Sequence, residues 1–282
     1  MKEKIKIEKN TVQETLIIPL YARKLCTERF PRLFQDKAAV ELLEHLDYDF
    51  SGFEKQSQSL MQVFGALEVA MRQNDLAWEV KDYLKEHPYA AVVNLGCGLD
   101  QTGRNCDNST CRIYNLDLPD VIRVRNQLVP AGDREENIAA DLNDFSWFDK
   151  IDASAGAVFF AAGVFYYFQK PMVKKLVTAM AEKFSGGRIV FDACGKMALK
   201  LMLKTWIKQA EIQDVGAYFY VLDAAAELGG WSPFLQVSNR GYMLGYFPMD
   251  DPDIKGIHRF LAKIGDGAMK MQIVRIDFRK KR

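Results

Sequence analysis

The sequence lacks an excess of charge of either sign: 38 lysine and arginine residues face 37 acidic residues, for a net charge of +1. Proteins that bind nucleic acid or anionic membranes through their overall field carry a clear basic excess. The balance therefore argues against both kinds of partner. The one basic run, at 279–282, is typical of a solvated tail.

Long apolar runs and paired cysteines are also missing. No stretch approaches the roughly 18 apolar residues that span a bilayer, and the charged residues 1–6 lack the apolar segment of a signal peptide. The five cysteines are odd in number and have no CxxC spacing, a pattern typical of free thiols rather than of disulfides or a metal site. We therefore expect a cytoplasmic protein with no metal and no membrane partner.

Histidine is scarce, which limits the choice of a catalytic base. The chain has only His45, His87 and His258, none in a segment with other signs of a site, and we assign them structural roles. A chain of 282 residues with 49% hydrophobic residues and no internal repeat is long enough to bury a full core. We interpret residues 1–282 as one domain, and the sequence leaves its oligomeric state open.

Hydrophobic periodicity divides this domain into four parts. Residues 1–88 have apolar stripes at helical spacing and predict a helical N-terminal cover, in which Pro19 either kinks the first helix (11–30) or marks its true start. Residues 89–195 predict a cofactor-binding core, 196–235 a helical insertion, and 236–282 late strands.

The core combines short apolar runs with helical segments in alternation. The runs, typical of strands buried on both faces, are at 90–95, 112–116, 157–161 and 188–191. Helical patterns separate them at 121–128 and 172–184, and two late strands are expected at 242–247 and 271–278. This alternation predicts an α/β fold with a doubly wound, mostly parallel sheet.

Glycines follow the first predicted strand directly, at Gly96-Cys97-Gly98. In open α/β sheets, ligands bind beyond the carboxyl ends of the strands at the switch point. Glycine allows a sharp turn there and lets a ligand approach without a Cβ in the way. A GxG alone is a weak signal, so its place after a buried strand carries the interpretation.

An acid, Asp117, ends the second predicted strand 19 residues after Gly98. A carboxylate there can accept hydrogen bonds from the hydroxyls of an adenosine ribose. The same features describe a nicotinamide-binding fold, but its GxGxxG pattern needs glycine at 101 and the chain has Gln101, which lowers this reading without excluding it. Asp141, after a short third strand, is placed either beside an adenine or on a surface turn.

Two segments together resemble the leucine carboxyl methyltransferase family, which includes bacterial O-methyltransferases of polyketide biosynthesis. They are VVNLGCGLD at 92–100 and LDLPDVI at 116–122. The likeness extends from about residue 11 to 247 and is weakest after 195. It implies a class I, Rossmann-like methyltransferase fold and S-adenosylmethionine as cofactor.

The resemblance also implies a set of cofactor-binding residues. Arg72 matches an arginine that pairs with the cofactor's carboxylate, and either Arg23 or Lys24 matches a second basic residue. Asp117 takes the ribose role, and Asp141 with Leu142 the adenine side. The expected cofactor-binding set is Arg23, Arg72, Gly96, Cys97, Gly98, Asp117, Leu118, Asp141, Leu142 and Ala162.

Two departures from the family pattern affect the expected chemistry. Gln101-Thr102 follows Asp100 where relatives often have Thr-Arg, and Ala162 stands where many have an acid before glycine. Loss of that acid removes one expected cofactor contact. The alternative function is therefore a cofactor-binding protein with weak or no catalysis.

The acceptor is expected to be a small molecule methylated on a carboxylate, which needs no base, or on a hydroxyl, which needs one. A protein C-terminal carboxylate is the alternative. The insertion is expected to form the acceptor pocket, with Phe219, Tyr220 and Trp231 as candidate walls. The other candidate acceptor residues are Tyr166, Tyr167, Arg240 and Tyr242.

Overall fold

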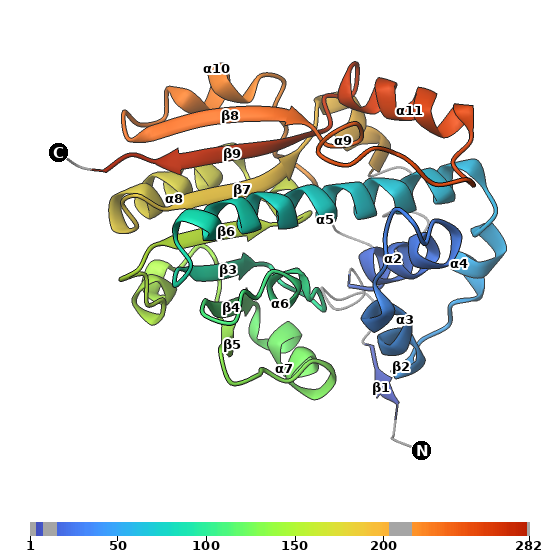
Figure 1. Cartoon of the computed structure of the whole chain (residues 1–282), viewed down its shortest axis with the longest axis horizontal. Helices are drawn as coiled ribbons and strands as arrows, with labels where there is room; N and C mark the ends of the chain where they lie inside the picture. The colour runs from blue at the N-terminus through green and yellow to red at the C-terminus, as the bar shows by residue number, and fades with distance from the viewer. Residues whose placement is uncertain (1–3, 8–15, 203–215, 281–282) are drawn as a thin grey trace.

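Seven strands form the main sheet in the computed structural model, which describes residues 4–7, 16–202 and 216–280 (Figure 1). In the order in which they lie side by side, the strands are β5 (Glu135–Ala139), β4 (Arg112–Asp117), β3 (Ala91–Leu95), β6 (Ala157–Ala161), β7 (Arg188–Ala193), β9 (Gln272–Phe278) and β8 (Leu235–Gly241).

The sheet is doubly wound and mostly parallel, as the sequence predicts. The five strands from β5 to β7 run parallel, and β9 lies antiparallel between β7 and β8. The first strand of this sheet along the chain is β3, which lies in its interior. The following strands, β4 and β5, are added on one side of β3, and the chain then crosses to form β6 on the other side. The switch point therefore lies between β3 and β6, where a ligand crevice is expected.

Alternating residues of the central strands face two separate cores. Val92 and Phe160 point into the core under the N-terminal helices, whereas Val93 and Phe159 point into the opposite core. All four side chains are fully buried. Because both faces of these strands are buried, neither face needs polar side chains, and the runs are continuously apolar.

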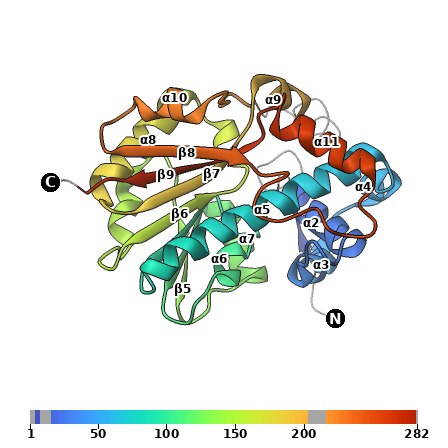
Figure 2. The same cartoon turned by 45° about the horizontal axis from the view of Figure 1, so that its top comes forward.

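Helices cover both faces of this sheet (Figures 1 and 2). They are α2 (Ile17–Arg29), α3 (Lys37–Glu44), α4 (Ser51–Gln56), α5 (Leu60–Glu86), α6 (Thr102–Asn105), α7 (Pro119–Leu128), η1 (Phe145–Lys150), η2 (Phe165–Tyr167), α8 (Lys170–Lys183), α9 (Lys196–Met202), α10 (Ala224–Gly229) and α11 (Gly256–Asp266). A two-stranded parallel pair, β1 (Ile5–Lys6) with β2 (Leu46–Asp47), joins the N-terminal segment to the end of α3.

The N-terminal helices cover one edge of the switch point. Helix α5 is 27 residues long and packs against β6 and β7 on one side and α2 on the other. Helix α2 begins at Ile17, so Pro19 lies in its first turn, where its missing N–H costs no hydrogen bond. Pro19 thus stands near the start of the helix, one of the two expected roles. Residues 11–15 of the predicted helix lie outside the described residues.

Two predicted elements differ from the structure. The late strand expected at 242–247 is wrong, because β8 lies at Leu235–Gly241. β8 is an edge strand in which only Leu235 is fully buried, so it lacks the apolar run that marks the inner strands. The insertion is helical only at α9 and α10 among the described residues, since 216–223 form no helix and 203–215 lie outside the described ranges.

No helix within the described ranges is long and apolar enough to cross a bilayer. The five cysteines are all buried and none forms a disulfide.

The packing of α5 on the sheet yields a stability prediction. Leu67 is fully buried in the core under the N-terminal helices, so Leu67→Ala is expected to lower the free energy of unfolding by about 2–5 kcal/mol. Denaturant titration measures this loss. Leu60→Ala on the same helix, where the side chain is 41% exposed, is the control and should cost less than about 1 kcal/mol. Equal losses in both variants would contradict the packing described.

Candidate active site

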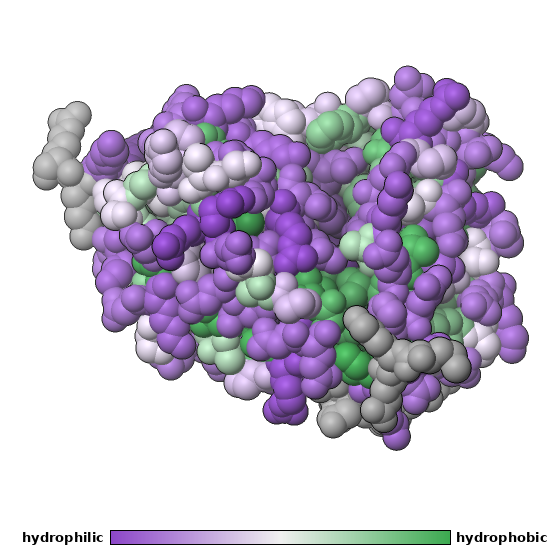
Figure 3. Space-filling model, turned by 60° about the horizontal axis from the view of Figure 1, so that its bottom comes forward, coloured by the Kyte–Doolittle hydropathy of each residue, from purple (hydrophilic) through white to green (hydrophobic). Residues whose placement is uncertain are grey.

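A cavity of about 720 Å³ lies at the carboxyl ends of the parallel strands, under α2 and α5. On the face shown in Figure 3, hydrophobic residues gather in a hollow among polar surroundings. Most of the predicted site residues line this cavity, but Arg240, Phe219, Tyr220 and Trp231 do not. Those that do are Arg23, Arg72, Gly96, Cys97, Gly98, Asp117, Leu118, Asp141, Leu142, Ala162, Tyr166, Tyr167 and Tyr242.

The glycine loop has the backbone conformation that its residues predict. Gly96 and Gly98 both have positive φ, at 64° and 48°, in the region that L side chains rarely adopt. A Cβ on Gly96 would lie 2.6 Å from Cγ2 of Val164. The loop therefore needs glycine for its conformation and for close packing as well.

Asp117 is hydrogen-bonded to the glycine loop. Its Oδ2 accepts from the Gly98 N–H at 2.7 Å, and its Oδ1 accepts from the Leu118 N–H at 2.8 Å. The Cys97 N–H donates to the carbonyl of Leu116 at 2.9 Å, so the loop is also joined to β4 through the backbone. Burial raises the pKa of Asp117, against the lowering effect of these N–H groups. The carboxylate keeps free lone pairs for a ligand hydroxyl.

The geometry after the loop disfavours a pyrophosphate. Helix α6 has only four residues, and the Asp100 carboxylate accepts from both the N–H and the hydroxyl of Thr102 at its start. A phosphate-binding turn instead presents free N–H groups and no negative charge. Asp100 also accepts from Gln73 and Asn94, so it is held in this position.

The end of β5 supplies the third side of the cavity. Asp141 is exposed, and its Oδ1 accepts from the backbone and side-chain N–H groups of Asn143 at 2.9 Å. Leu142 is buried beside it. This turn presents a carboxylate next to an apolar side chain, an arrangement that can hold the edge and the face of a flat base.

Arg72 reaches the cavity from α5 and pairs with the buried Asp192 at the end of β7. Arg72 Nη1 lies 2.9 Å from Asp192 Oδ2, which also accepts from the Tyr166 hydroxyl at 2.9 Å. Asp192 Oδ1 accepts from the Gly163 N–H at 2.6 Å. Nε of Arg72 is buried and has no partner among the described residues. The guanidinium is therefore fixed in direction but not saturated.

Arg23, rather than Lys24, faces the cavity. Arg23 is 5% exposed, and its Nε lies 2.9 Å from Asp36, the N-cap residue of α3. Lys24 pairs with Glu28 on the surface of α2 and does not line the cavity. Of the two residues that the sequence left open, Arg23 is on the side of α2 that faces the cavity and Lys24 is on the surface.

Arg240 is a predicted site residue that lies outside the cavity. Its guanidinium pairs with the buried Asp75 at 2.5 Å and lies over the ring of Tyr246, and it does not line the cavity. The expectation that Arg240 meets an anionic acceptor is therefore wrong. Sequence placed it near a late strand, but only the fold shows that this side chain points toward α5.

The predicted aromatic walls are also corrected. Phe219 is fully buried in the second core, and neither Tyr220 nor Trp231 lines the cavity. Residues 216–221 form neither helix nor strand, and the N–H of Tyr218 donates to the carbonyl of Tyr166 at 2.7 Å. Tyr218 lines the cavity, whereas Phe219 packs into the second core.

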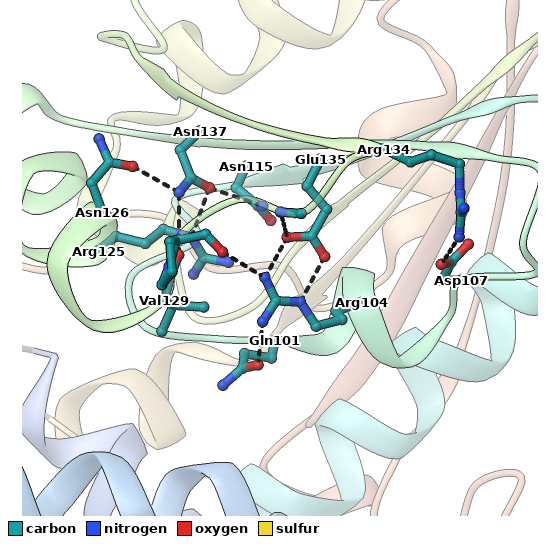
Figure 4. A network of polar contacts seen from close by, with 12 residues as sticks. Gln101, Arg104, Asp107, Asn115, Arg125, Asn126, Val129, Arg134, Glu135 and Asn137 are labelled. Atoms are coloured by element: carbon teal, nitrogen blue, oxygen red, sulfur yellow. Dashed lines mark hydrogen bonds and ion pairs between the residues drawn. The ribbon is translucent and has the colours of Figure 1, made fainter.

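Arg125 on α7 is a site residue that the sequence did not single out. It is 2% exposed, and its Nη1 donates to the carbonyls of Gly98 at 2.9 Å and Asp100 at 2.7 Å. Its Nε donates to the Oδ1 of Asn137 in the polar network behind the loop (Figure 4). An arginine in an amphipathic helix is usually exposed, so no local pattern distinguishes this one. Arg125 supports the glycine loop from behind.

Glu68 and Asp192 were likewise missed. Glu68 lies one turn before Arg72 on α5 and lines the cavity, and residues four apart share a helix face. That spacing was available from the sequence once Arg72 was chosen. Asp192 directly follows the strand predicted at 188–191. An acid at the carboxyl end of a strand beside the switch point could have been predicted as a site residue on that ground.

The support of the loop by Arg125 can be tested by Arg125→Met. This change leaves two buried carbonyls without their donor, so we expect the free energy of unfolding to fall by about 1–3 kcal/mol and S-adenosylhomocysteine to bind more weakly. Denaturant unfolding and titration calorimetry measure the two effects. The control is Arg123→Met, an exposed arginine on the same helix, which should change neither. A stable Arg125→Met variant with unchanged binding would refute the supporting role.

Comparison with known proteins places this site in a family. The family model for leucine carboxyl methyltransferase matches residues 9–181. The tetracenomycin polyketide synthesis O-methyltransferase TcmP of Streptomyces glaucescens is 30% identical over 183 residues. That alignment covers 64% of this chain and 66% of the relative, slightly less than two thirds of its length.

Solved structures are similar over almost the whole chain. A candidate methyltransferase from Thermobifida fusca YX has a TM-score of 0.57 at 15% identity, covering 97% of this chain and 96% of its own. A duf574 family protein from Streptomyces avermitilis MA-4680 has a TM-score of 0.60 at 11% identity, covering 94% and 97%. These likenesses show the fold. The sequence match shows the family: the chain belongs to the leucine carboxyl methyltransferase family of S-adenosylmethionine-dependent methyltransferases.

Proposed function

We propose that the protein is an S-adenosylmethionine-dependent O-methyltransferase acting on a small molecule, with a carboxylate or hydroxyl oxygen as acceptor. The observation that carries the proposal is the contact between Asp117 and the glycine loop at one end of a cavity of about 720 Å³. The rest of this cavity is largely apolar and aromatic. One end suits a nucleoside and the other an organic acceptor.

Different residues of the cavity suit different parts of the methyl donor. Asp117 would accept the ribose hydroxyls, and Asp141 with Leu142 would hold the adenine. Arg72 would pair with the amino-acid carboxylate, since its guanidinium keeps a buried N–H without a partner and suits a carboxylate. When bound, the donor supplies a methyl group activated on a sulfonium.

The protein's own contribution is positioning. Methyl transfer is an in-line displacement, so aligning two bound reactants can supply up to about 7–11 kcal/mol of the barrier. The glycine loop is fixed by Asp117 in front and Arg125 behind, and Asp192 fixes the direction of Arg72. The cavity lies under α2 and α5.

Aromatic side chains favour a flat organic acceptor. Tyr166, Tyr167, Phe168, Tyr218 and Tyr242 line the cavity, and the relative from Streptomyces glaucescens is described as an O-methyltransferase of polyketide synthesis. An aromatic polyketide-like molecule is therefore the first acceptor class to test. A leucine carboxylate, which the family description names, is the second, and we test it as the C-terminal residue of a peptide.

The experiment has a binding part and a turnover part. Titration calorimetry of the full chain with S-adenosylhomocysteine should give measurable binding; no binding at millimolar ligand would contradict the proposal. Methyl transfer from labelled S-adenosylmethionine is then measured against polycyclic aromatic acids and phenols and against leucine-terminated peptides. Methylated aromatic products support the proposal, whereas binding without any turnover supports the cofactor-binding protein that Ala162 suggested.

Asp117→Ala tests the ribose assignment. The variant loses an acceptor for two ligand hydroxyls, so we expect the affinity for S-adenosylhomocysteine to weaken by about 1.5–3 kcal/mol, the range for hydrogen bonds to a charged group. Titration calorimetry measures the change. Asp120→Ala removes the same charge three residues away and should have a small effect. Unchanged affinity in a folded Asp117→Ala protein would disprove the assignment.

A further inference from the structure

Helix α5 turns one stripe of side chains toward the cavity. Gly65, Glu68, Val69, Arg72 and Gln73 all line it, and their spacing of three and four residues places them on one face of the helix. This stripe carries an acid and a base one turn apart, at positions 68 and 72. Side chains at this spacing start about 5–6 Å apart, so their charged ends can reach the same small group.

Arg72 lies at the switch point of the sheet, beside the end of β6. A Cβ on Gly163, two residues after β6, would lie 3.1 Å from Nη1 of Arg72. A Cβ on Gly96 would meet Val164, so the glycine loop after β3 and the turn after β6 are packed together there. We therefore place the amino-acid end of the methyl donor beside Arg72, an assignment that rests on the proposed function.

An amino-acid end carries two opposite charges on one carbon atom. Its carboxylate suits the guanidinium of Arg72. Its ammonium also leaves water when the donor binds, so it needs hydrogen-bond acceptors and a compensating negative charge. Glu68 lies near enough to Arg72 for the two charges to influence each other, and both line the cavity. A group that contacts Arg72 is therefore within reach of Glu68.

We propose that the Glu68 carboxylate binds the ammonium of the donor, so that Glu68 and Arg72 together hold the amino-acid end as a zwitterion. The ammonium donates to the carboxylate oxygens of Glu68, and the donor's carboxylate accepts from Arg72. Position 162, where the family pattern predicts an acidic cofactor contact, is alanine in this chain. Glu68 supplies a carboxylate to the same cavity from a different element.

The other acids that line the cavity within the described ranges have different positions. Asp117 binds the glycine loop at the end of β4, and Asp141 lies after β5. Asp100 already accepts four hydrogen bonds from neighbouring residues. Glu68 is the acid that shares a helix face with Arg72, which is why we assign the ammonium to it.

The charge of Glu68 depends on its neighbours. The titratable and charged groups around Glu68 and Arg72 come from η2, from the end of β7 and from the residue after β8, and they are Tyr166, Asp192, Cys194 and Tyr242. Burial raises the pKa of Glu68 to about 7, against the lowering effect of Arg72. Burial also raises the pKa of Cys194 to about 12 and that of Tyr242 well above its usual value, so both stay neutral near pH 7. A bound ammonium favours the charged form of Glu68 and lowers its pKa in the complex.

The first test compares two ligands at pH 8, where Glu68 is mostly ionised. The full chain is titrated with S-adenosylhomocysteine and with its deamino analogue, which keeps the nucleoside, the sulfur and the carboxylate but has hydrogen in place of the ammonium. We expect wild type to bind S-adenosylhomocysteine at least about tenfold more tightly, the factor that one hydrogen bond to a charged group supplies. A wild type that binds both ligands equally overturns the proposal.

Glu68→Gln should remove most of this preference. Glutamine has the same shape without the charge, so the affinity for S-adenosylhomocysteine should fall about tenfold. The affinity for the deamino analogue should stay the same or rise, because its carboxylate no longer meets a nearby negative charge. Glu86→Gln, an exposed glutamate at the end of the same helix, is the matched control and should bind both ligands as wild type does. An equal loss for both ligands in Glu68→Gln, or an unchanged preference, shows that Glu68 does not bind the ammonium.

The second test measures proton release by calorimetry at pH 6 in two buffers of different ionisation enthalpy. Because the pKa of Glu68 is about 7 in the free protein and lower in the complex, S-adenosylhomocysteine should release more protons on binding than the deamino analogue does. Its affinity should rise with pH up to about 7 and level off above that value. The nucleoside is common to both ligands, so their difference isolates the ammonium, and Glu68→Gln should abolish it. Equal proton release by both ligands in wild type contradicts the proposal.

The two proposals fail in different ways. If neither ligand binds at millimolar concentration, the proposed function itself is wrong. If both bind wild type equally, or lose affinity equally in Glu68→Gln, the cofactor site stands and only the role of Glu68 is wrong. Thermal unfolding checks that each variant is folded, and the comparison of the two ligands on wild type depends on no variant.

Discussion

The site depends on one contact, between the carboxylate of Asp117 and the backbone N–H of Gly98. It joins the ends of two neighbouring strands and places a charged acceptor beside a bend that has no side chains. Because Gly96 and Gly98 have positive φ, the bend cannot be formed by most other residues. The same contact that shapes the loop also orients the acid toward a ligand.

The loop is supported on its other side by a second buried charge. Arg125 donates to the carbonyls of Gly98 and Asp100. The loop is therefore held on one side by Asp117, which accepts from its N–H group, and on the other by Arg125, which donates to its carbonyls. A buried guanidinium is costly unless its donors are satisfied, and here loop carbonyls and Asn137 satisfy them. The loop and its ligand contacts are thus preorganised by the protein, which lowers the cost of binding.

Charge pairing fixes the direction of Arg72 at the cavity. Arg72 is directed by Asp192, which also accepts hydrogen bonds from Tyr166 and Gly163. Glu68, one helical turn from Arg72, has no such partner among the described residues. Helix α5 therefore brings a basic and an acidic side chain to the cavity, four residues apart, because it packs on β6 and β7.

The sequence by itself determined the strand–helix alternation, the glycine bend and the acid at the end of the second strand, because these follow from local periodicity and from backbone rules that act over a few residues. It also identified several residues that line the cavity, among them Arg72, Asp117 and Tyr166, once the family pattern was recognised. Only the tertiary structure decided which way single side chains point. Arg240 turns to Asp75, Phe219 turns into the core, and Arg125 turns inward to the loop. Such choices depend on partners distant in the chain, so no local pattern encodes them.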